Sequence, residues 1–307
     1  MRTAFVGAVE ASRRALESLV ASGCAPNLVV TLPPETATRH SDYADLSSAA
    51  KQGGSDLLFT RDINDDETCR ALESLSPDLL LVIGWSQICR ERLRNIPSIG
   101  LIGFHPAPLP ALRGRAAIPW TILVGLEETA ATLFWIDEGC DSGDILLQSH
   151  FPVAPDETAR TLYDKHVAAL CRMLPGVLSG IAAGTIHRVP QNPDQASYCA
   201  RRRPEDGRID WSRPALEIDR LVRAVGTPYP GAFTELNGHR IIIDSARPHQ
   251  GAPRYFGLPG QIQEVHGRQM RISCGDFSCL DVTAWRSESS GFPPRHAILG
   301  QHGGSPR

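Results

Sequence analysis

The stretch Asp66–Trp85, DETCRALESLSPDLLLVIGW, carries the signals that decide the fold. Its first half places apolar residues at helical spacing, which predicts an amphipathic helix. A Ser-Pro-Asp sequence then ends the helix, because proline lacks a backbone donor and disfavours a helical residue before it. The following run, Leu79–Ile83, is apolar throughout, as in a strand buried on both faces of a parallel sheet. A helix followed by such a strand predicts an α/β domain.

The neighbouring segments extend this pattern in both directions. A short apolar run at residues 3–9 ends near a glycine and is followed by a helical pattern at 12–22 and an apolar run at 27–32. Residues 99–105, IGLIGFH, supply a further strand. We therefore expect a doubly wound, Rossmann-like sheet. Ligands bind outside the carboxyl ends of the strands in such sheets, so Trp85 and His105 are expected at one crevice.

The chain continues with a helix that has Pro119 in its first turn, and then with two strands around a polar loop. The strands are ATLFWI and DILLQSHFPV, and the loop between them is Asp137–Asp144, so a hairpin-like pair is predicted. Residues 156–184 form the longest helical pattern.

A second, smaller domain is predicted beyond a polar and arginine-rich segment. Five short apolar runs separated by Gly and Pro follow a short helix at 211–225, which favours a small β-barrel of the oligonucleotide/oligosaccharide-binding (OB) type. The predicted organisation is a catalytic domain at 1–190, a linker at 191–210, an OB-like domain at 211–290 and a tail at 291–307.

Composition limits the classes of function. The formal net charge is −3 and the pI is about 6.4 for 307 residues, which disfavours a globally basic nucleic-acid binder. Eight cysteines occur without a CxxC pair, so neither a zinc site nor a disulfide framework is indicated, and we expect no metal. No signal peptide or membrane span is recognisable, and a soluble cytoplasmic protein is expected.

One histidine lies in an unusual setting. The segment Gly103–Trp120, GFHPAPLPALRGRAAIPW, holds His105 among several prolines and before an Arg-Gly-Arg sequence. Prolines make this a stiff loop, because they fix φ and cannot donate to a ladder. A histidine on a stiff loop after a buried strand suits a catalytic base, although many such histidines are only structural.

Two motifs carry a resemblance to a known family. GFHPAPLPALRG, followed by DEGCDSGDIL some 36 residues later, resembles the paired signature of folate-dependent formyltransferases. That signature has an Asn-x-His-Pro-Ser-Leu-Leu-Pro-x-x-Arg-Gly loop and then a Leu-Asp-x-Gly-Asp loop. The segment YCARRRPEDGRIDW is similar to a Pro-Glu-Asp-Gly-x-Ile-Asp-Trp stretch of the same family. The resemblance implies formyl transfer from 10-formyltetrahydrofolate to an amine, without a metal.

Residue-by-residue comparison with the family implies specific roles. His105 would be the central catalytic histidine and Asp141 the carboxylate that orients it or relays protons. Gly103 stands at the catalytic position where the family has an asparagine, and Ala107 replaces the family's serine. Loss of one oxyanion donor typically costs about 10²–10³ in rate, so a water, the His105 imidazolium or the backbone N–H of Gly103 would have to substitute.

The resemblance also implies the residues of two binding surfaces. Arg113 and Gly114 match the family's Arg-Gly pair, and the arginine would either brace the loop or meet an anionic substrate. The triplet Arg201, Arg202 and Arg203 would suit a diphosphate or form a solvated charge cluster. The walls of the folate pocket are expected from two segments: Val82, Ile83, Gly84, Trp85 and Ile88 on one side, and Asp137, Glu138, Gly139, Cys140, Asp141 and Asp144 on the other.

The sequence leaves more than one class of acceptor amine open. A nucleotide-linked amino sugar or another small amine is favoured, because residues 31–54 hold few basic side chains for capturing tRNA phosphates. Methionyl-tRNA is the alternative acceptor, so a nucleic-acid partner is disfavoured but not excluded. A non-catalytic folate binder is a third possibility, motivated by Gly103, and a HypX-like enzyme without an amine acceptor is a fourth. A homodimer is also possible.

Overall fold

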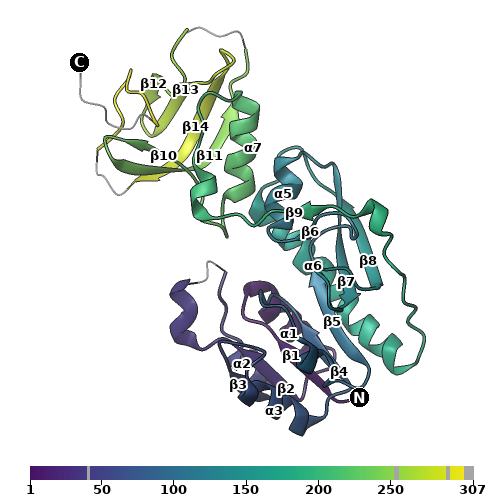
Figure 1. Ribbon diagram of the computed structural model, residues 1–307. Helices are drawn as coiled ribbons and strands as arrows, with labels where there is room; N and C mark the ends of the chain where they lie inside the picture. Colours follow the sequence, from purple (N-terminus) through teal and green to yellow (C-terminus); the bar gives the residue numbers. More distant parts are fainter. Residues whose placement is uncertain (40–41, 252–255, 288–290, 301–307) are drawn as a thin grey trace. The chain divides into compact units, whose positions relative to one another are not determined.

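The computed structural model describes residues 1–39, 42–251, 256–287 and 291–300 (Figure 1). The chain forms two compact units. The first comprises Met1–Ala117, Glu127–Val153 and Leu162–Arg201, and the second comprises Ile118–Leu126, Ala154–Thr161 and Arg202–Arg307. Residues 118–126 and 154–161, which the sequence analysis gave to the catalytic domain, thus belong to the second unit.

A seven-stranded sheet in the order β3-β2-β1-β4-β5-β7-β8 forms the first unit. Its first five strands are parallel, and β7 and β8 are antiparallel to the strands before them. The order 3-2-1-4 is that of doubly wound sheets, which confirms the predicted Rossmann-like fold. The strands are β1 (Thr3–Val6), β2 (Leu28–Thr31), β3 (Asp56–Phe59), β4 (Leu79–Val82), β5 (Gly100–His105), β7 (Glu128–Trp135) and β8 (Ile145–Pro152).

Helices cover both faces of this sheet. One apolar core packs side chains of the sheet against α1 and α6, and a second core packs its other face against α3 and α4. The run Leu79–Ile83 is buried throughout because it contributes to both cores, as its composition predicts. The helices of this unit are α1 (Glu10–Ala21), α2 (Ser47–Gly53), α3 (Asp66–Leu75), α4 (Glu91–Arg94) and most of α6 (Ala159–Ala182). Nearly all of α5 (Ala117–Leu123) belongs to the second unit.

The sequence analysis missed α2 and β3. The β3 strand lies at the sheet edge, and three of its four residues are exposed, so it lacks the apolar pattern by which a strand is recognised. The predicted hairpin was correct: β7 pairs with β8 from Glu128 opposite Pro152 to Phe134 opposite Ile145.

The second unit contains a five-stranded antiparallel sheet in the order β10-β11-β14-β13-β12, with α7 (Ala215–Val225) packed on β11. The predicted small barrel-like domain of five short strands is confirmed. Register shifts in β11 between Ile243 and Ala246 bend that strand. The strands are β10 (Ala232–Leu236), β11 (His239–Pro248), β12 (Ile262–His266), β13 (Gln269–Ser273) and β14 (Cys279–Ser287).

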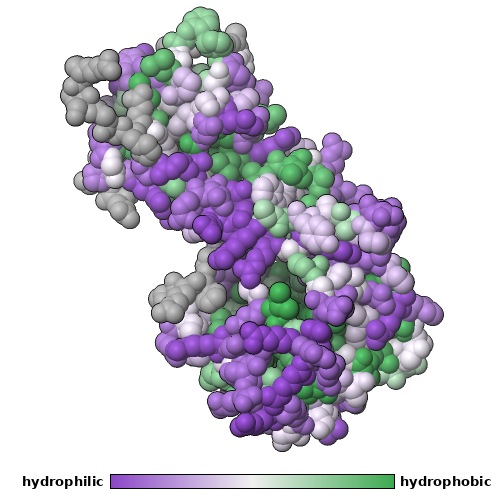
Figure 2. Space-filling view, viewed as in Figure 1, coloured by the Kyte–Doolittle hydropathy of each residue, from purple (hydrophilic) through white to green (hydrophobic). Residues whose placement is uncertain are grey.

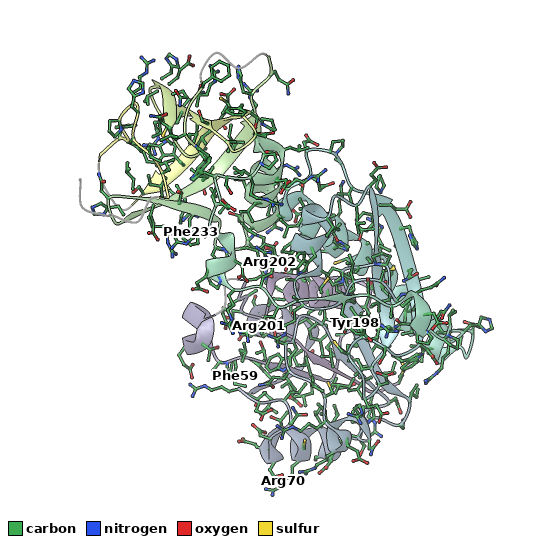
Figure 3. All side chains as sticks on the ribbon, turned by 45° about the horizontal axis from the view of Figure 1, so that its top comes forward. Phe59, Arg70, Tyr198, Arg201, Arg202 and Phe233 are labelled. Atoms are coloured by element: carbon green, nitrogen blue, oxygen red, sulfur yellow. The ribbon has the colours of Figure 1, made fainter. Side chains whose placement is uncertain are left out.

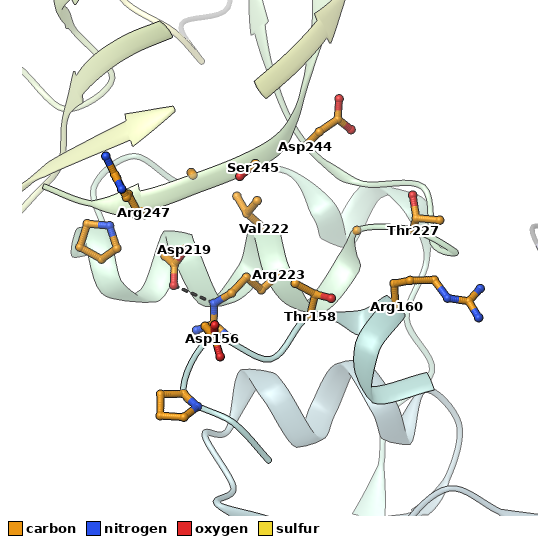
Figure 4. Close-up of a pocket in the computed structure, with 14 residues that line it drawn as sticks. Asp156, Thr158, Arg160, Asp219, Val222, Arg223, Thr227, Asp244, Ser245 and Arg247 are labelled. Carbon is orange, nitrogen blue, oxygen red and sulfur yellow. Dashed lines mark hydrogen bonds and ion pairs between the residues drawn. The ribbon is translucent and has the colours of Figure 1, made fainter. Parts of the chain in front are cut away.

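A cavity of about 510 Å³ lies within the second unit, lined by residues 155–160, α7 and β11 (Figure 4). Arg223 on α7 forms an ion pair with Asp219 at 2.8 Å and donates to the carbonyl oxygen of Glu157 at 2.8 Å. The bond to Glu157 joins residues 154–161 to α7, and the ion pair within α7 holds the Arg223 side chain in place for it.

On the face shown in Figure 2, hydrophilic residues cover much of each unit, with smaller hydrophobic areas between them. Within the described residues, no helix combines the length and the apolar character needed to cross a bilayer.

A buried histidine on α6 makes the stability of the first unit depend on pH. His166 is 1% exposed, its ring lies edge-on to Phe151 at 4.9 Å, and neither ring nitrogen has a hydrogen-bond partner among the described residues. Burial lowers the pKa of His166 to about 3. In the unfolded chain, His166 binds a proton as the pH falls below about 6.5, whereas in the folded chain it stays neutral down to about pH 3. The free energy of unfolding therefore falls as the pH drops from about 6.5 towards 3.

We expect His166→Leu to remove this loss. The variant should gain about 2 kcal/mol relative to the unaltered protein on going from pH 7 to pH 5, measured by urea unfolding at both values. His187→Leu, at an exposed position, is the control and should show no such gain. Equal pH dependence in His166→Leu and the unaltered protein would contradict the assignment of a neutral buried ring.

Candidate active site

His105 ends β5 and is held by a backbone carbonyl. The ring is 5% exposed, and its Nε2 lies 2.7 Å from the carbonyl oxygen of Leu112. A carbonyl can only accept, so Nε2 carries the proton that it donates to Leu112. In the neutral ring, Nδ1 then has a free lone pair. The ring nitrogen available for proton transfer is therefore Nδ1.

Asp141 faces that nitrogen. Its Oδ2 lies 3.5 Å from Nδ1 of His105 and accepts the backbone N–H of Gly114 at 2.8 Å. Asp141 has φ = 51°, in the left-handed region that few residues with a side chain adopt. Backbone strain of this kind persists only where the surroundings fix it, and it occurs often at functional sites. The sequence analysis paired His105 with Asp141, and the structure brings the two side chains together.

The segment Leu112–Gly114 holds both side chains at once, since Leu112 bonds His105 and Gly114 bonds Asp141. Leu112 has φ = 59°, and its N–H donates to Oγ of Ser197 at 2.9 Å. Gly114 has φ = 96°, and a side chain at this position would start 3.0 Å from the carbonyl oxygen of Cys199. Glycine is thus required here both by conformation and by space.

This segment is fixed from the region predicted to be a linker. The short strand β6 (Arg113–Gly114) pairs in parallel with β9 (Tyr198–Cys199). Tyr198 is labelled in Figure 3. Residues 191–201 therefore do more than connect two domains: they support the loops that hold His105 and Asp141. Their polar and proline-bearing sequence gave no periodic signal of this contact.

Arg113 is a buried brace. The side chain is 5% exposed, Nε and Nη2 donate to Oε1 of Gln191 at 3.1 and 2.7 Å, and Nη1 donates to the hydroxyl of Tyr198 at 3.2 Å. Gln191 in turn donates through Nε2 to the carbonyl oxygens of Asp141 (2.9 Å) and Gly143 (2.7 Å). Of the two roles considered for Arg113, these contacts favour loop bracing over substrate binding. Gln191 and Ser197 were not identified from the sequence.

Replacing Gln191 by alanine should loosen the Asp141 loop. The change leaves a buried guanidinium without its main acceptor and two carbonyls without their donor, at a cost of about 2 kcal/mol in the free energy of unfolding. We expect a lower melting temperature together with weaker tetrahydrofolate binding, measured by thermal unfolding and calorimetry. Gln195→Ala, an exposed change in the same segment, should alter neither quantity. An unchanged melting temperature in Gln191→Ala would contradict the bracing role.

The first expected wall of the folate pocket follows β4. Val82 and Ile83 are buried, Gly84 has φ = 68°, and Trp85 is half-buried against the core that contains Val82. Gln87 shapes this turn by accepting from Nε1 of Trp85 at 3.1 Å and donating to the carbonyl oxygen of Arg61 at 2.8 Å. Ile88 is 71% exposed at the end of the turn. Half-buried and exposed apolar side chains of this kind suit the faces of a flat pterin ring.

The second expected wall, Asp137–Asp144, is held in shape by hydrogen bonds within the loop itself. The Asp137 carboxylate accepts from the Gly139 N–H at 2.9 Å and from the Ser142 hydroxyl, so it stabilises the loop. Asp144 bonds the N–H of Trp135 through its carbonyl oxygen. Glu138, Gly139 and Cys140 are exposed. Partial desolvation and the nearby Asp141 carboxylate raise the pKa of the Cys140 thiol, so this thiol is not activated.

The remaining sequence candidates are Gly103 and the arginine triplet. Gly103 lies inside the sheet, opposite Val82 on β4 and Phe134 on β7. Arg201 and Arg203 are exposed, and Arg202 is half-buried with its guanidinium 5.3 Å from the centre of the Trp120 ring (Figure 3). Diphosphate binding by these arginines stays a prediction. The described residues contain no cluster of three or more His, Cys, Asp or Glu able to hold a metal ion.

Comparison with known proteins identifies the family of the chain. Residues 12–178 match the formyl transferase family, and residues 202–289 match the formyl transferase C-terminal domain. The chain belongs to the formyltransferase family. It is an enzyme that takes its formyl group from a 10-formyltetrahydrofolate-type donor, as the resemblance predicted.

Named relatives share most of the chain. A methionyl-tRNA formyltransferase of Anaeromyxobacter dehalogenans is 34% identical over 300 residues, which cover 97% of this chain and 95% of the relative. A methionyl-tRNA formyltransferase of Agathobacter rectalis is 32% identical over 277 residues, or 90% of this chain and 88% of the relative.

Solved structures at lower identity share the fold. HypX from Aquifex aeolicus, in complex with tetrahydrofolic acid, has a TM-score of 0.68 at 20% identity, over 94% of this formyltransferase and 44% of HypX. An N-formyltransferase from Helicobacter canadensis, in complex with folinic acid and dTDP-3-aminofucose, has a TM-score of 0.67 at 18% identity, over 92% and 98% of the two chains.

Proposed function

We propose that this formyltransferase transfers the formyl group to a primary amine, with His105 and Asp141 as its catalytic residues. The observation that carries the proposal is the 3.5 Å contact between Nδ1 of His105 and Oδ2 of Asp141, with Nε2 already committed to Leu112. A free lone pair beside a carboxylate, in a largely buried position, is suited to accept and return a proton.

The proposed reaction moves the formyl group from N10 of the folate to the amine nitrogen. The neutral amine attacks the formyl carbon, a C–N bond forms, and the electron pair of the carbonyl moves to its oxygen. Nδ1 of His105 takes the proton that the amine loses, and Asp141 stabilises the resulting imidazolium. The oxyanion then re-forms the carbonyl, the bond between the formyl carbon and N10 of the folate breaks, and that nitrogen receives the proton. The products are a formamide and tetrahydrofolate.

The donor substrate would bind between the turn after β4 and the Asp137–Asp144 loop. Trp85 and Ile88 would contact the pterin, and the backbone around Gly84 would supply hydrogen bonds. Arg115 would border the donor at the first wall, since its Nη2 donates to the carbonyl oxygen of Ser86 at 2.8 Å.

The acceptor that the relatives support best is the aminoacyl end of methionyl-tRNA. Two relatives of that name align over 90% or more of this chain at 32–34% identity. This evidence reverses the order of preference given by the sequence, which placed a nucleotide-linked amino sugar first.

An amino sugar linked to a nucleotide is the second candidate, on a specific observation. In the segment before and through α2, residues 31–54, the basic side chains are those of Arg39, His40 and Lys51, against Glu35, Asp42 and Asp45. Phosphate capture depends on released counterions and hence on an excess of basic contacts, which this segment lacks. A small acceptor does not need that excess.

One assay separates the candidates. Purified enzyme is given 10-formyltetrahydrofolate with charged initiator methionyl-tRNA, or with a panel of nucleotide-linked amino sugars, and released tetrahydrofolate and formylated product are measured. Formylated methionyl-tRNA at the higher kcat/KM supports the first candidate, and a formylated sugar supports the second. Binding of tetrahydrofolate without turnover of either acceptor class, or of simple amines, would contradict the proposed amine transfer and favour a folate-binding role.

A further inference from the structure

The glycine at the family's asparagine position is explained by its neighbours. Gly103 lies in an ordinary strand and outside the left-handed region, so its backbone does not require glycine. A side chain there would begin 2.8 Å from both Cε1 and Cζ of Phe134 and 3.0 Å from Cγ1 of Ile136. These separations are shorter than van der Waals contact, so the ring of Phe134 already occupies the space above Gly103.

This space borders the catalytic histidine. Side chains alternate along a strand, so positions 103 and 105 of β5 lie on the same face of the sheet. Phe134 stands opposite Gly103 on β7, and Thr132 stands opposite His105. Phe134 is 4% exposed and therefore closely packed. The wall beside His105 is hydrocarbon where the family has a carboxamide.

The backbone of Gly103 offers no replacement donor. The residue lies in the interior of the sheet, paired with Val82 on one side and Phe134 on the other. Backbone groups of an interior strand are committed to its ladders. Of the substitutes considered from the sequence, the N–H of Gly103 is therefore disfavoured.

We propose that Phe134 determines how this site stabilises the oxyanion, because it fills the volume of the missing carboxamide and makes a matched pair with Gly103. The negative charge of the oxyanion is then balanced by the imidazolium of His105, which forms as the amine loses its proton. The steric part of this proposal, that Phe134 leaves no room for a side chain at position 103, stands on the packing alone. The catalytic part, that this determines how the oxyanion is stabilised, rests on the proposed function.

A double-mutant cycle tests the pair. Gly103→Asn should lower the melting temperature by about 3–10 °C, because the added side chain must displace a buried ring. Phe134→Ala opens the space, so the combined variant should melt at a higher temperature than the sum of the two single shifts predicts. Leu133→Ala is the matched control: it shortens the adjacent residue of β7, which is fully buried in the core on the other face, and should not rescue Gly103→Asn.

Activity tests the catalytic part. The combined variant regains a carboxamide beside His105, so its kcat should exceed that of Phe134→Ala by about tenfold or more. Additive melting shifts would overturn the matched pair. A combined variant no faster than Phe134→Ala, although rescued in stability, would overturn the catalytic role of this volume. If the unaltered protein formylates no amine, the proposed function fails, and the melting cycle still decides the steric part.

Discussion

Replacing His105 by alanine is expected to lower kcat by about 10³-fold while the protein stays folded. The change removes Nδ1, the proposed proton acceptor, and with it the imidazolium proposed to balance the oxyanion. In this chain the loss should be severe, because position 103 has no side chain that could share the charge. Release of tetrahydrofolate and formation of the formamide under saturating donor and acceptor give kcat directly.

The control is a histidine outside the site. His150 lies on β8 with its ring 53% exposed and its Nδ1 at 2.9 Å from Glu128, so His150→Ala should keep near-normal activity. Tetrahydrofolate binding by His105→Ala, followed by calorimetry, shows whether the pocket is intact. If His105→Ala binds folate normally and retains more than a tenth of the activity, His105 is a structural residue that only anchors Leu112.

Asp141→Asn is expected to lower kcat by about 10²–10³-fold with little change in stability. The amide oxygen of asparagine can still accept the Gly114 N–H that Oδ2 accepts at 2.8 Å, so the loop should hold its shape. What is lost is the negative charge 3.5 Å from Nδ1 of His105, and with it the stabilisation of the imidazolium. The loss should therefore appear in kcat rather than in the KM for the folate donor.

Two further carboxylate variants serve as controls for Asp141→Asn. Asp194→Asn removes an exposed carboxylate from the segment that supports the catalytic loop, and should leave both constants unchanged. Asp137→Asn perturbs the Asp137–Ser142 bonds inside the Asp141 loop, and should raise KM more than it lowers kcat. An Asp141→Asn enzyme with normal kcat would show that the carboxylate is only a loop anchor.

Much of the fold could be predicted because its signals are local. The run Leu79–Ile83 is apolar at every position, and only a strand covered on both faces requires that. The hairpin of β7 and β8 follows from two apolar runs around a polar loop, and the five strands of the second unit follow from regular Gly and Pro breaks. The β3 strand escaped prediction because an exposed edge strand has no such pattern.

The site was only partly predictable. His105 and Asp141 lie in motifs whose order and spacing resemble those of a family, so they could be named in advance. Gln191, Ser197 and Tyr198 could not, because they act through backbone carbonyls, a backbone N–H and one buried guanidinium, and lie some 50 to 90 residues from the groups they hold. Contacts of this kind leave no periodicity in the sequence.

The sequence by itself determined the doubly wound sheet and the small β domain, since hydrophobic period is a property of the chain alone, and its resemblance to a family supplied the two catalytic candidates. Only the tertiary structure decided which nitrogen of His105 is free, that Arg113 is a brace, and why position 103 is glycine. The physical reason is that each answer depends on an atom brought close by folding: the carbonyl of Leu112, the amide of Gln191 and the ring of Phe134.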